Sequence, residues 1–424
     1  MWKYYNLFLS TTKRPHPIRY MDYDCLVVGA GISGLFSARE ILKKHPKWKV
    51  GLAERYKGVG GRTYTYTHGN ERWEAGAGRV HKSHKHTMNL IKSYGLTWIP
   101  ISKDTRFKQD GTSPIIINNF DETSKMYLKV LTRLPKNVLA NHTLESIMKA
   151  VYGETKDFFS YFPYRSEVNT LRADLALKAF LDGEMSDHGG YGVIKEGFGQ
   201  LVARMKKELI DRGCKFLTDH TLINLKKDGA CIFEDHIIKA DKIILALDRD
   251  SLAKITAFRN WETLKHLKAQ PLLRIYGVFK KPWFPPGPPI VTPGPLRYII
   301  PVGEKTVMVS YTDSEDTRAF YRVQKAGGDE TLQKLIMKET RKLFPDLDIP
   351  DPVFFKSHYW SMGATYWLPG SYNPEELSIK SIRPLPSLPK VWLTGESWSL
   401  RQAWVEGALE QTLLCLSDVD RHDV

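Results

Sequence analysis

The pattern of apolar and polar positions near the start of the chain predicts a strand, a helix and a second strand. Residues 23–28 form an apolar run rich in valine, which is typical of a buried strand. After a glycine-rich turn, apolar residues recur at helical spacing from Leu35 to Leu42, and Pro46 marks the end of that helix. Residues 48–53 predict the next strand. We therefore expect a βαβ unit here.

Weaker patterns continue towards the C-terminus. The segment 100–189 has the composition of polar turns mixed with helical stretches, at 139–151 and 166–181. Further helices are predicted at 198–210 and 405–417, and further strands at 215–217, 236–238, 242–247 and 391–395. Seven prolines between Pro282 and Pro295 argue against regular structure in that stretch.

The predicted strands fit one sheet whose pieces are far apart in the sequence. We therefore expect an α/β fold in which a discontinuous, Rossmann-like nucleotide-binding domain accompanies an α+β substrate-binding domain. A length of 424 residues agrees with two domains. The expected parts are an N-terminal extension at 1–21, the nucleotide domain at 22–100, 190–255 and 385–424, and the substrate domain at 101–189 and 256–384.

The turn after the first strand carries a candidate binding site. Gly29, Gly31 and Gly34 have the spacing GxGxxG and open the predicted helix. In this motif the first glycine permits the tight turn, the second lets the backbone approach a pyrophosphate, and the third lets helix and strand pack closely. The helix N-terminus favours the negative phosphates. Glu54 follows twenty residues later, where an acid accepts hydrogen bonds from ribose hydroxyls.

A second glycine-rich segment, at 58–63, follows directly after the second strand. It includes Gly61 and Arg62, and an arginine can pair with phosphate in a forked geometry. This second segment favours FAD over NAD as the dinucleotide.

Several motifs in one order resemble the flavin amine oxidase family, which includes monoamine, polyamine and L-amino-acid oxidases. The resemblance extends from about Asp22 to Leu416. It is carried by VVGAGISGL, GGR, EAGAGR with its Gly78, IKEGF, LTGES with its Gly395, and AWVEGAL. It implies an amine-oxidase type of fold that binds FAD, with a small amine or amino acid and molecular oxygen as the other reactants.

The resemblance also implies cofactor contacts at particular positions. Glu54 matches the ribose acid, and Arg62 a residue that anchors the phosphate region. The backbone of Leu222 matches a contact to adenine, and Glu396 an acid that reaches the ribityl and phosphate portion. Trp404 and Val405 open the last helix, whose N-terminus matches one that points at the pyrimidine edge of the flavin.

On the substrate side, the resemblance favours an amino acid. Arg79 matches an arginine that clamps the substrate carboxylate in L-amino-acid oxidases, and Tyr311 a tyrosine that helps to hold it. Trp404 matches one wall of an aromatic cage for the amine, with Tyr366 or Trp367 as the other wall, and Trp360 matches a tryptophan that lines the flavin. These candidate residues come from four separate segments.

One position departs from the family pattern. Arg274 stands where the family has a lysine that holds a water near N5 and assists reoxidation by oxygen. An arginine stays charged and cannot act as a tunable base. The leading interpretation is an oxidase that produces hydrogen peroxide. A polyamine oxidase, which would need acids along its tunnel, and a flavin-binding structural or assembly protein without turnover remain alternatives.

Composition and charge narrow the partners. The formal net charge of +15 is spread in short pairs without interleaved aromatics, which argues against nucleic acid and leaves an acidic partner or a homodimer open. No apolar run is long enough to span a membrane, and no signal peptide is evident. Four widely spaced cysteines fit a reducing intracellular compartment. His81, His84 and His86 lack partners at ligand spacing, so no metal is expected.

The first prediction concerns how the flavin is attached. Relatives with covalent flavin use a cysteine in the region of 363–366, and this chain has Ala364 there. The purified protein should be yellow, and acid or heat should release free FAD into the supernatant. Flavin that stays with the precipitate would contradict non-covalent binding. A colourless protein that takes up no added FAD would contradict flavin binding altogether.

Overall fold

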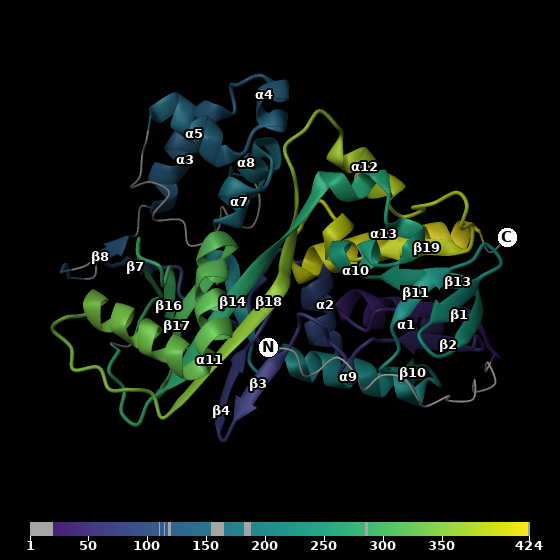
Figure 1. The fold of residues 1–424 in the computed structure, drawn as a ribbon, viewed down its shortest axis with the longest axis horizontal. Coiled ribbons are helices and arrows are strands. Elements are labelled where there is room, and N and C mark those ends of the chain that lie inside the picture. The colour runs from purple at the N-terminus through teal and green to yellow at the C-terminus, as the bar shows by residue number, and fades with distance from the viewer. Residues whose placement is uncertain are drawn as a thin grey trace, which may run out of the picture.

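Two large sheets organise the chain in the computed structural model, which describes residues 20–109, 111–113, 115–117, 120–153, 165–181, 188–284 and 287–422. Most of the predicted extension at 1–21 therefore lies outside the described residues. The first sheet and its helices occupy one half of Figure 1, and the second sheet with α11 (Ser314–Leu343) occupies the other. A helical group lies above the second sheet: α3 (Phe120–Leu131), α4 (Lys136–Asn141), α5 (Leu144–Tyr152), α7 (Ser166–Asn169) and α8 (Ala173–Leu181).

The first sheet is built around the predicted βαβ unit. The core strand β1 (Tyr20–Val28) pairs in parallel with β2 (Val50–Ala53) on one side and β13 (Ile237–Ala246) on the other. Cys25, Leu26 and Val27 are fully buried, because helices and further chain cover both faces, and this explains the continuous apolar run. The remaining strands are β10 (Lys215–Leu217), β11 (Leu222–Leu225), β12 (Ala230–Phe233) and β19 (Val391–Thr394).

Four helices and a small sheet also belong to this half. Helix α1 (Ile32–Lys44) contacts both α9 (Phe198–Asp211) and α13 (Val405–Arg421). Helix α9 buries one stripe, at Phe198, Leu201, Met205 and Leu209, as its amphipathic sequence requires. The small sheet contains β5 (Val80–His81), β6 (Trp98–Pro100) and β9 (Tyr191–Ile194), and α2 (Lys85–Ser93) follows β5.

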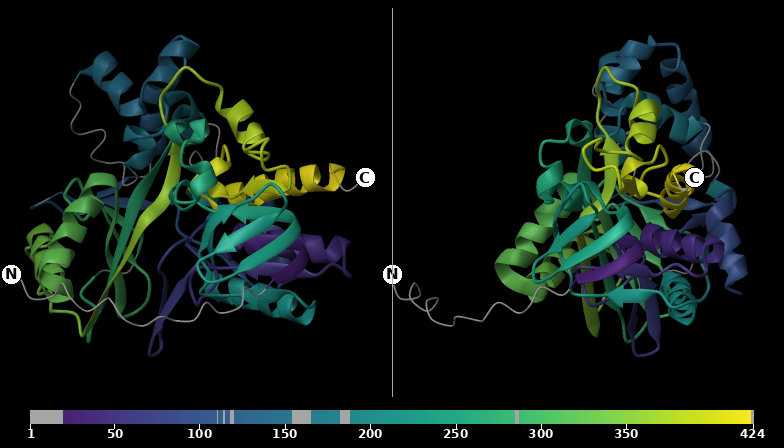
Figure 2. Two further views of the ribbon diagram at one scale, coloured as in Figure 1. Left: turned by 45° about the vertical axis from the view of Figure 1, so that its right-hand side comes forward. Right: turned by 90° about the vertical axis from the view of Figure 1, so that its right-hand side faces the viewer.

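The second sheet supplies a long pair of strands between the two halves. β14 (Leu267–Val278) pairs with β18 (Phe354–Trp367), and the pair stands between α11 and the first half in both views (Figures 1 and 2). β14 also pairs with β17 (Thr306–Asp313). The sheet continues through β16 (Tyr298–Pro301), β15 (Ile290–Val291), β7 (Thr105–Phe107) and β8 (Ile115–Ile117).

Shorter elements connect these layers. They are the hairpin of β3 (Thr65–His68) and β4 (Glu71–Glu74), and the helices α10 (Arg249–Ala253) and α12 (Pro374–Lys380). The strands of the first sheet come from the segments predicted for the nucleotide domain, and those of the second from the other segments. The domain boundaries themselves stay a prediction. Within the described residues, no helix is long and apolar enough to cross a membrane.

Several predicted elements were wrong in extent. The strands predicted at 236–238 and 242–247 form one strand, β13, because its polar residues face outward while β1 pairs along most of its length. The helix predicted at 139–151 is broken before Thr143, whose side chain accepts a bond from Ser146 N and caps α5. The helix predicted at 166–181 is broken where Arg172 N bonds Trp367 O instead.

Many strands were not predicted, among them β7, β8 and β15 and the long strands β17 and β18. β7 and β8 lie in the segment 100–189, which was expected to hold turns and helices, and they are only three residues each. The stretch 282–295, where prolines argued against regular structure, does contain one short strand, β15. Its residues Ile290 and Val291 pair with strands on both sides. The last helix, α13, continues to Arg421 beyond the predicted end at 417.

The second prediction separates fold from cofactor binding. A Cβ at Gly34 would lie 1.8 Å from the carbonyl oxygen of Gly29, so Gly34→Ala should destabilise the apoprotein by about 3 kcal/mol or more. Gly31 has a negative φ, and a Cβ there would meet no atom within 4 Å. Gly31→Ala should therefore leave the melting temperature of the apoprotein unchanged and weaken FAD binding. Equal melting temperatures for the two variants would contradict this division.

Candidate cofactor and substrate site

A cavity of about 540 Å³ lies between the two large sheets. Its walls come from the carboxyl end of β1, the start of α1 and the start of α13 on one side, and from β14, β17 and β18 on the other. Every predicted site residue except Gly34 and the alternative wall residue Trp367 lines it. These residues are Gly29, Gly31, Glu54, Gly61, Arg62, Gly78, Arg79, Leu222, Arg274, Tyr311, Trp360, Tyr366, Gly395, Glu396, Trp404 and Val405.

The N-terminus of α1 faces this cavity without a protein cap. Gly31 is the N-cap residue, it makes no side-chain cap, and the first turn contains no acid. Gly29 has φ of +100°, a conformation that favours glycine. Gly34 lies one turn into the helix, where its missing Cβ permits the close approach to Gly29. The arrangement leaves the N–H groups of the first turn available to an anion.

Glu54 is fixed at the end of β2 by two backbone groups. Its Oε2 accepts a hydrogen bond from Ala30 N at 2.8 Å, and its Oε1 accepts one from Tyr56 N at 3.1 Å. Each carboxylate oxygen can accept a further bond. The side chain lines the cavity beside Gly29 and Gly31, which is the position that a ribose acid requires.

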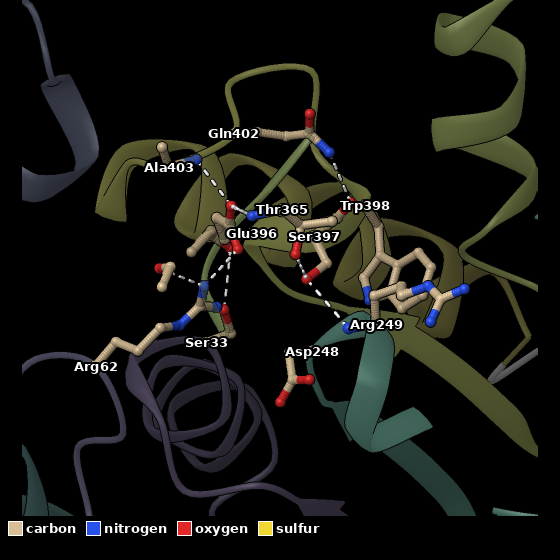
Figure 3. Close-up of polar contacts among 12 residues, drawn as sticks. Ser33, Arg62, Asp248, Arg249, Thr365, Glu396, Ser397, Trp398, Gln402 and Ala403 are labelled. Atoms are coloured by element: carbon tan, nitrogen blue, oxygen red, sulfur yellow. Dashed lines mark hydrogen bonds and ion pairs between the residues drawn. The ribbon is translucent and has the colours of Figure 1, made fainter. Parts of the chain in front are cut away.

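A partly buried ion pair ties three distant segments together (Figure 3). Arg62 donates from Nη1 to Glu396 Oε2 at 2.8 Å and to the carbonyl of Gly363 at 3.1 Å. Glu396 Oε1 accepts from Thr365 N at 3.1 Å and from Ala403 N at 2.8 Å. Burial opposes the charge of Arg62, but the carboxylates of Glu396 and Asp248 outweigh it and raise the pKa of the guanidinium.

The start of α13 is the second helix N-terminus at the cavity. Trp404 is its N-cap residue and makes no side-chain cap. The acid in its first turn, Glu406, is turned to α2 instead, where it accepts bonds from His86 N at 2.9 Å and from Thr87 N at 2.8 Å. The carboxylate of this first-turn acid therefore caps α2 and not α13.

Aromatic rings surround the guanidinium of Arg79. Trp404 stacks on Tyr191 with ring centroids 5.7 Å apart, and His84 contacts it edge-on at 5.1 Å. Cζ of Arg79 lies 5.0 Å from the ring centre of Tyr191 and 5.9 Å from that of Trp404. Burial, with smaller contributions from Arg401 and His81, lowers the pKa of His84 to about 3, so that ring stays neutral.

The two candidates for the second aromatic wall have different surroundings. Tyr366 lines the cavity and donates its hydroxyl to Glu167 Oε1 at 3.0 Å. Trp367 points into the core: it is fully buried, and its indole N–H donates to Ser399 O at 3.0 Å. The alternative that named Trp367 as a cage wall was therefore wrong, because neighbouring residues of a strand point to opposite faces.

The remaining predicted residues lie on the second sheet. Arg274 is opposite Tyr311 on β17 and His358 on β18, and its Cζ lies 4.9 Å from the ring centre of Tyr311. Its Nη1 donates to Glu74 O at 3.0 Å. Nε of Arg274 is buried and has no hydrogen-bond partner among the described residues. Trp360 donates its indole N–H to Ala75 O at 2.7 Å.

Two acids at the substrate end were missed in the sequence. Glu167 comes from α7, and Asp313 ends β17; both line the cavity. Asp313 accepts bonds from Arg165 N at 3.1 Å and Ser166 N at 3.0 Å. No motif surrounds Glu167, and a four-residue helix gives no clear periodicity, so only the fold could bring it to the site.

The three histidines excluded as metal ligands make local contacts. Nδ1 of His81 lies 2.7 Å from Ser83 Oγ, and His84 Nδ1 accepts from His81 N at 3.3 Å. Among the described residues a different set has ligand atoms within 4.8 Å of one another: His220, Asp235 and His236. In that set Asp235 already pairs with its neighbour: Oδ1 of Asp235 lies 2.5 Å from Nδ1 of His236. The expectation of no metal stays a prediction.

The third prediction tests Glu54. Glu54→Gln removes the charge-assisted bonds to ribose, so FAD affinity should fall at least about tenfold, measured by fluorescence titration of the apoprotein. Since Glu54 also receives two backbone N–H groups, the melting temperature of the apoprotein serves as the control. An unchanged dissociation constant would mean that another residue holds the ribose.

Comparisons with known proteins agree with this geometry. A family model described as flavin-containing amine oxidoreductase matches residues 32–414. A putrescine oxidase variant from a redesign of cofactor binding has a TM-score of 0.76 at 15% identity, and covers 95% of this chain and 100% of its own. Wild-type putrescine oxidase bound to putrescine has a TM-score of 0.73 at 16% identity, and covers 95% of this chain and 100% of its own.

A third structure, assigned as a protoporphyrinogen oxidase from Exiguobacterium sp. 255-15, gives a TM-score of 0.71 at 13% identity and covers 96% of this chain and 100% of its own. A search of curated proteins gives no match. At these identities the structures show the fold alone. The residues present fit FAD: the N-terminus of α1 is open, Gly31 leaves space, and Glu54 lies beside both. The match to the family model over most of the chain shows that it belongs to the flavin-containing amine oxidoreductases and that its cofactor is FAD.

Proposed function

We propose that this protein is an oxidase for an α-amino acid. The amino acid, oxygen and water would give a 2-oxo acid, ammonium and hydrogen peroxide. When bound, FAD supplies the chemistry by accepting a hydride from the carbon that bears the amine and passing two electrons to oxygen. The chain's own residues bind the substrate, orient it and exclude water.

The proposal rests chiefly on one observation, the position of Arg79 at the wall of the cavity. Its guanidinium lies over the rings of Tyr191 and Trp404, next to the N-terminus of α13. A planar guanidinium can bind a carboxylate with two parallel hydrogen bonds. Binding the carboxylate at that point would fix the orientation of the carbon next to it, which is the carbon to be oxidised.

Two neighbours add to the attraction for a carboxylate. Arg274 lines the same cavity, and burial opposes its charge but the hydroxyls of Tyr276 and Tyr311 raise its pKa, so it remains a cation. The hydroxyl of Tyr311 is a further donor beside it. A substrate whose only charge is an ammonium would meet two guanidinium groups without a compensating anion of its own, which favours an amino acid over a simple monoamine.

Arg274 also supports a second candidate, a flavoprotein without oxidase turnover. Arg274 is held by Glu74 O and the ring of Tyr311, and it does not supply the tunable amine that the family's lysine provides. Flavin reduction under anaerobic conditions, followed by peroxide measurement after air is admitted, separates the two candidates. Reduction of the flavin without later formation of peroxide would support the second candidate, the flavoprotein without oxidase turnover.

The fourth prediction tests the substrate class. Arg79→Ala should weaken the binding of α-amino acids that reduce the wild-type flavin, by about 3 kcal/mol, because a desolvated carboxylate would lose its partner. Arg79→Lys keeps the charge without the planar fork and should lose part of the affinity. The binding of amines without a carboxylate should change little in either variant. The measurement is the reduction of the flavin in anaerobic stopped-flow experiments.

The outcomes of this experiment are distinct. Both variants should retain FAD, since the phosphates are expected at Gly31 and Arg62. If Arg79→Ala sheds the flavin, or if the wild-type flavin is reduced only by amines lacking a carboxylate, the amino-acid proposal is wrong.

A further inference from the structure

Glu167 is an acid at the cavity that none of the functions above uses. It lies on α7, and its side chain lines the cavity together with Tyr366. Its Oε1 accepts the hydroxyl hydrogen bond of Tyr366 at 3.0 Å. Its Oε2 is buried and accepts no hydrogen bond from any described residue. Half of this carboxylate is therefore bound by the protein and half is not.

An unsatisfied buried carboxylate oxygen is costly in the absence of a ligand. Buried polar groups normally have partners, and a buried charge without one destabilises the fold. Burial first, and the neighbouring Asp313 second, raise the pKa of Glu167 to about 7, although Tyr366 and Arg79 act in the opposite direction. A cation placed against Oε2 would remove the penalty and keep the carboxylate ionised.

The neighbouring acid does not share this property. Both carboxylate oxygens of Asp313 accept backbone hydrogen bonds, from Arg165 N and from Ser166 N, and so hold the start of α7 in place. Asp313 thus fixes the helix that carries Glu167, and Tyr366 fixes the carboxylate itself. The unpartnered oxygen of Glu167 is the part of this acid pair that lacks a hydrogen bond from the described part of the chain and that a ligand would satisfy.

We infer that Glu167 binds a second positively charged group of the substrate, separate from the amine that is oxidised. Combined with the carboxylate site proposed at Arg79, this makes the substrate an α-amino acid with a cationic side chain. The part that concerns the carboxylate rests on the proposed function; the part that concerns the cation rests on Glu167 alone. A guanidinium and an open carboxylate in one cavity suit a substrate that carries both charges.

Two matched pairs of compounds test the two parts separately. L-lysine and L-norleucine share a carbon chain and differ in the side-chain ammonium. Putrescine and n-butylamine differ in the same way and lack the carboxylate. For the holoenzyme, the dissociation constant of each compound is measured anaerobically from the flavin absorbance change, and independently from the shift in melting temperature. In whichever pair the wild-type protein binds, it should bind the compound with two ammonium groups at least tenfold more tightly than the compound with one.

The variant Glu167→Gln keeps the size and the contact to Tyr366 and removes the charge. It should reduce the preference for L-lysine over L-norleucine at least tenfold, and leave L-norleucine binding within twofold. Glu376→Gln, an exposed acid on α12 outside the cavity, makes the same change in net charge and should have no effect. In the wild type the preference should also fall as pH drops through 7, since protonation removes the negative charge.

The results distinguish the two proposals. A preference for putrescine over n-butylamine that Glu167→Gln abolishes, without binding of either amino acid, would support the cation site and overturn the amino-acid proposal. Equal binding of L-lysine and L-norleucine by the wild type, with equal binding of the two amines, would overturn the cation site and leave Arg79 untouched. Should Glu167→Gln fail to fold, the wild-type comparison and its pH dependence decide alone.

Discussion

The ion pair of Arg62 and Glu396 is the interaction on which the geometry of the cavity depends. Its members are 334 positions apart and join the loop after β2 to the segment between β19 and α13. Glu396 also accepts the backbone N–H groups of Thr365 and Ala403, so β18 and the approach to α13 are fixed to the same carboxylate. Because Glu396 is 6% exposed, removing the arginine would leave a buried anion without its cation, a loss of about 3 to 5 kcal/mol. The pair therefore fixes the position of the cofactor half of the cavity relative to the substrate half.

Local chemistry in the sequence was sufficient to predict the cofactor half. The spacing of Gly29, Gly31 and Gly34 imposes a turn, a close approach and a helix N-terminus within a few residues, and each requirement is visible in the sequence itself. The family motifs then indicated distant residues such as Glu396. The substrate half was harder, because its residues meet through pairings between distant strands. Which of two adjacent aromatic residues faces the cavity depends on strand register, and a shift of one residue exchanges them.

Glu167 shows the limit of prediction from sequence most clearly. It lies in a four-residue helix, and what makes it unusual is burial together with an open oxygen, which depends on Tyr366 from β18 and on Asp313 from β17. Neither neighbour is near it in the sequence. A polyamine oxidase was expected to need acids along its tunnel, and two acids, Glu167 and Asp313, do line the cavity. The basic surface of the whole chain thus gave little information about the charge inside the cavity, because net charge averages over groups that water screens.

The helix dipoles and the charged side chains at the cavity act together on a bound substrate. The N-termini of α1 and α13 both face the cavity, and Glu406, which could have offset the dipole of its own helix, binds the N–H groups of α2 instead. Arg79 and Arg274 add positive charge at the substrate end, which suits the carboxylate proposed there, and the two helix N-termini suit the phosphates of FAD. Glu167 differs from the other acids that line the cavity, because its Oε2 is buried and has no hydrogen-bond partner among the described residues. A carboxylate with one open oxygen among cationic groups would attract a small cation less strongly than an isolated acid would, so a simple monoamine would gain little there. A substrate that brings its own carboxylate to the arginines reduces the surrounding positive charge as it binds, which makes Glu167 a more favourable site for its ammonium or guanidinium. Selection for both charges would therefore arise from the two contacts and from the coupling between them, because each charge of the substrate makes the other contact more favourable.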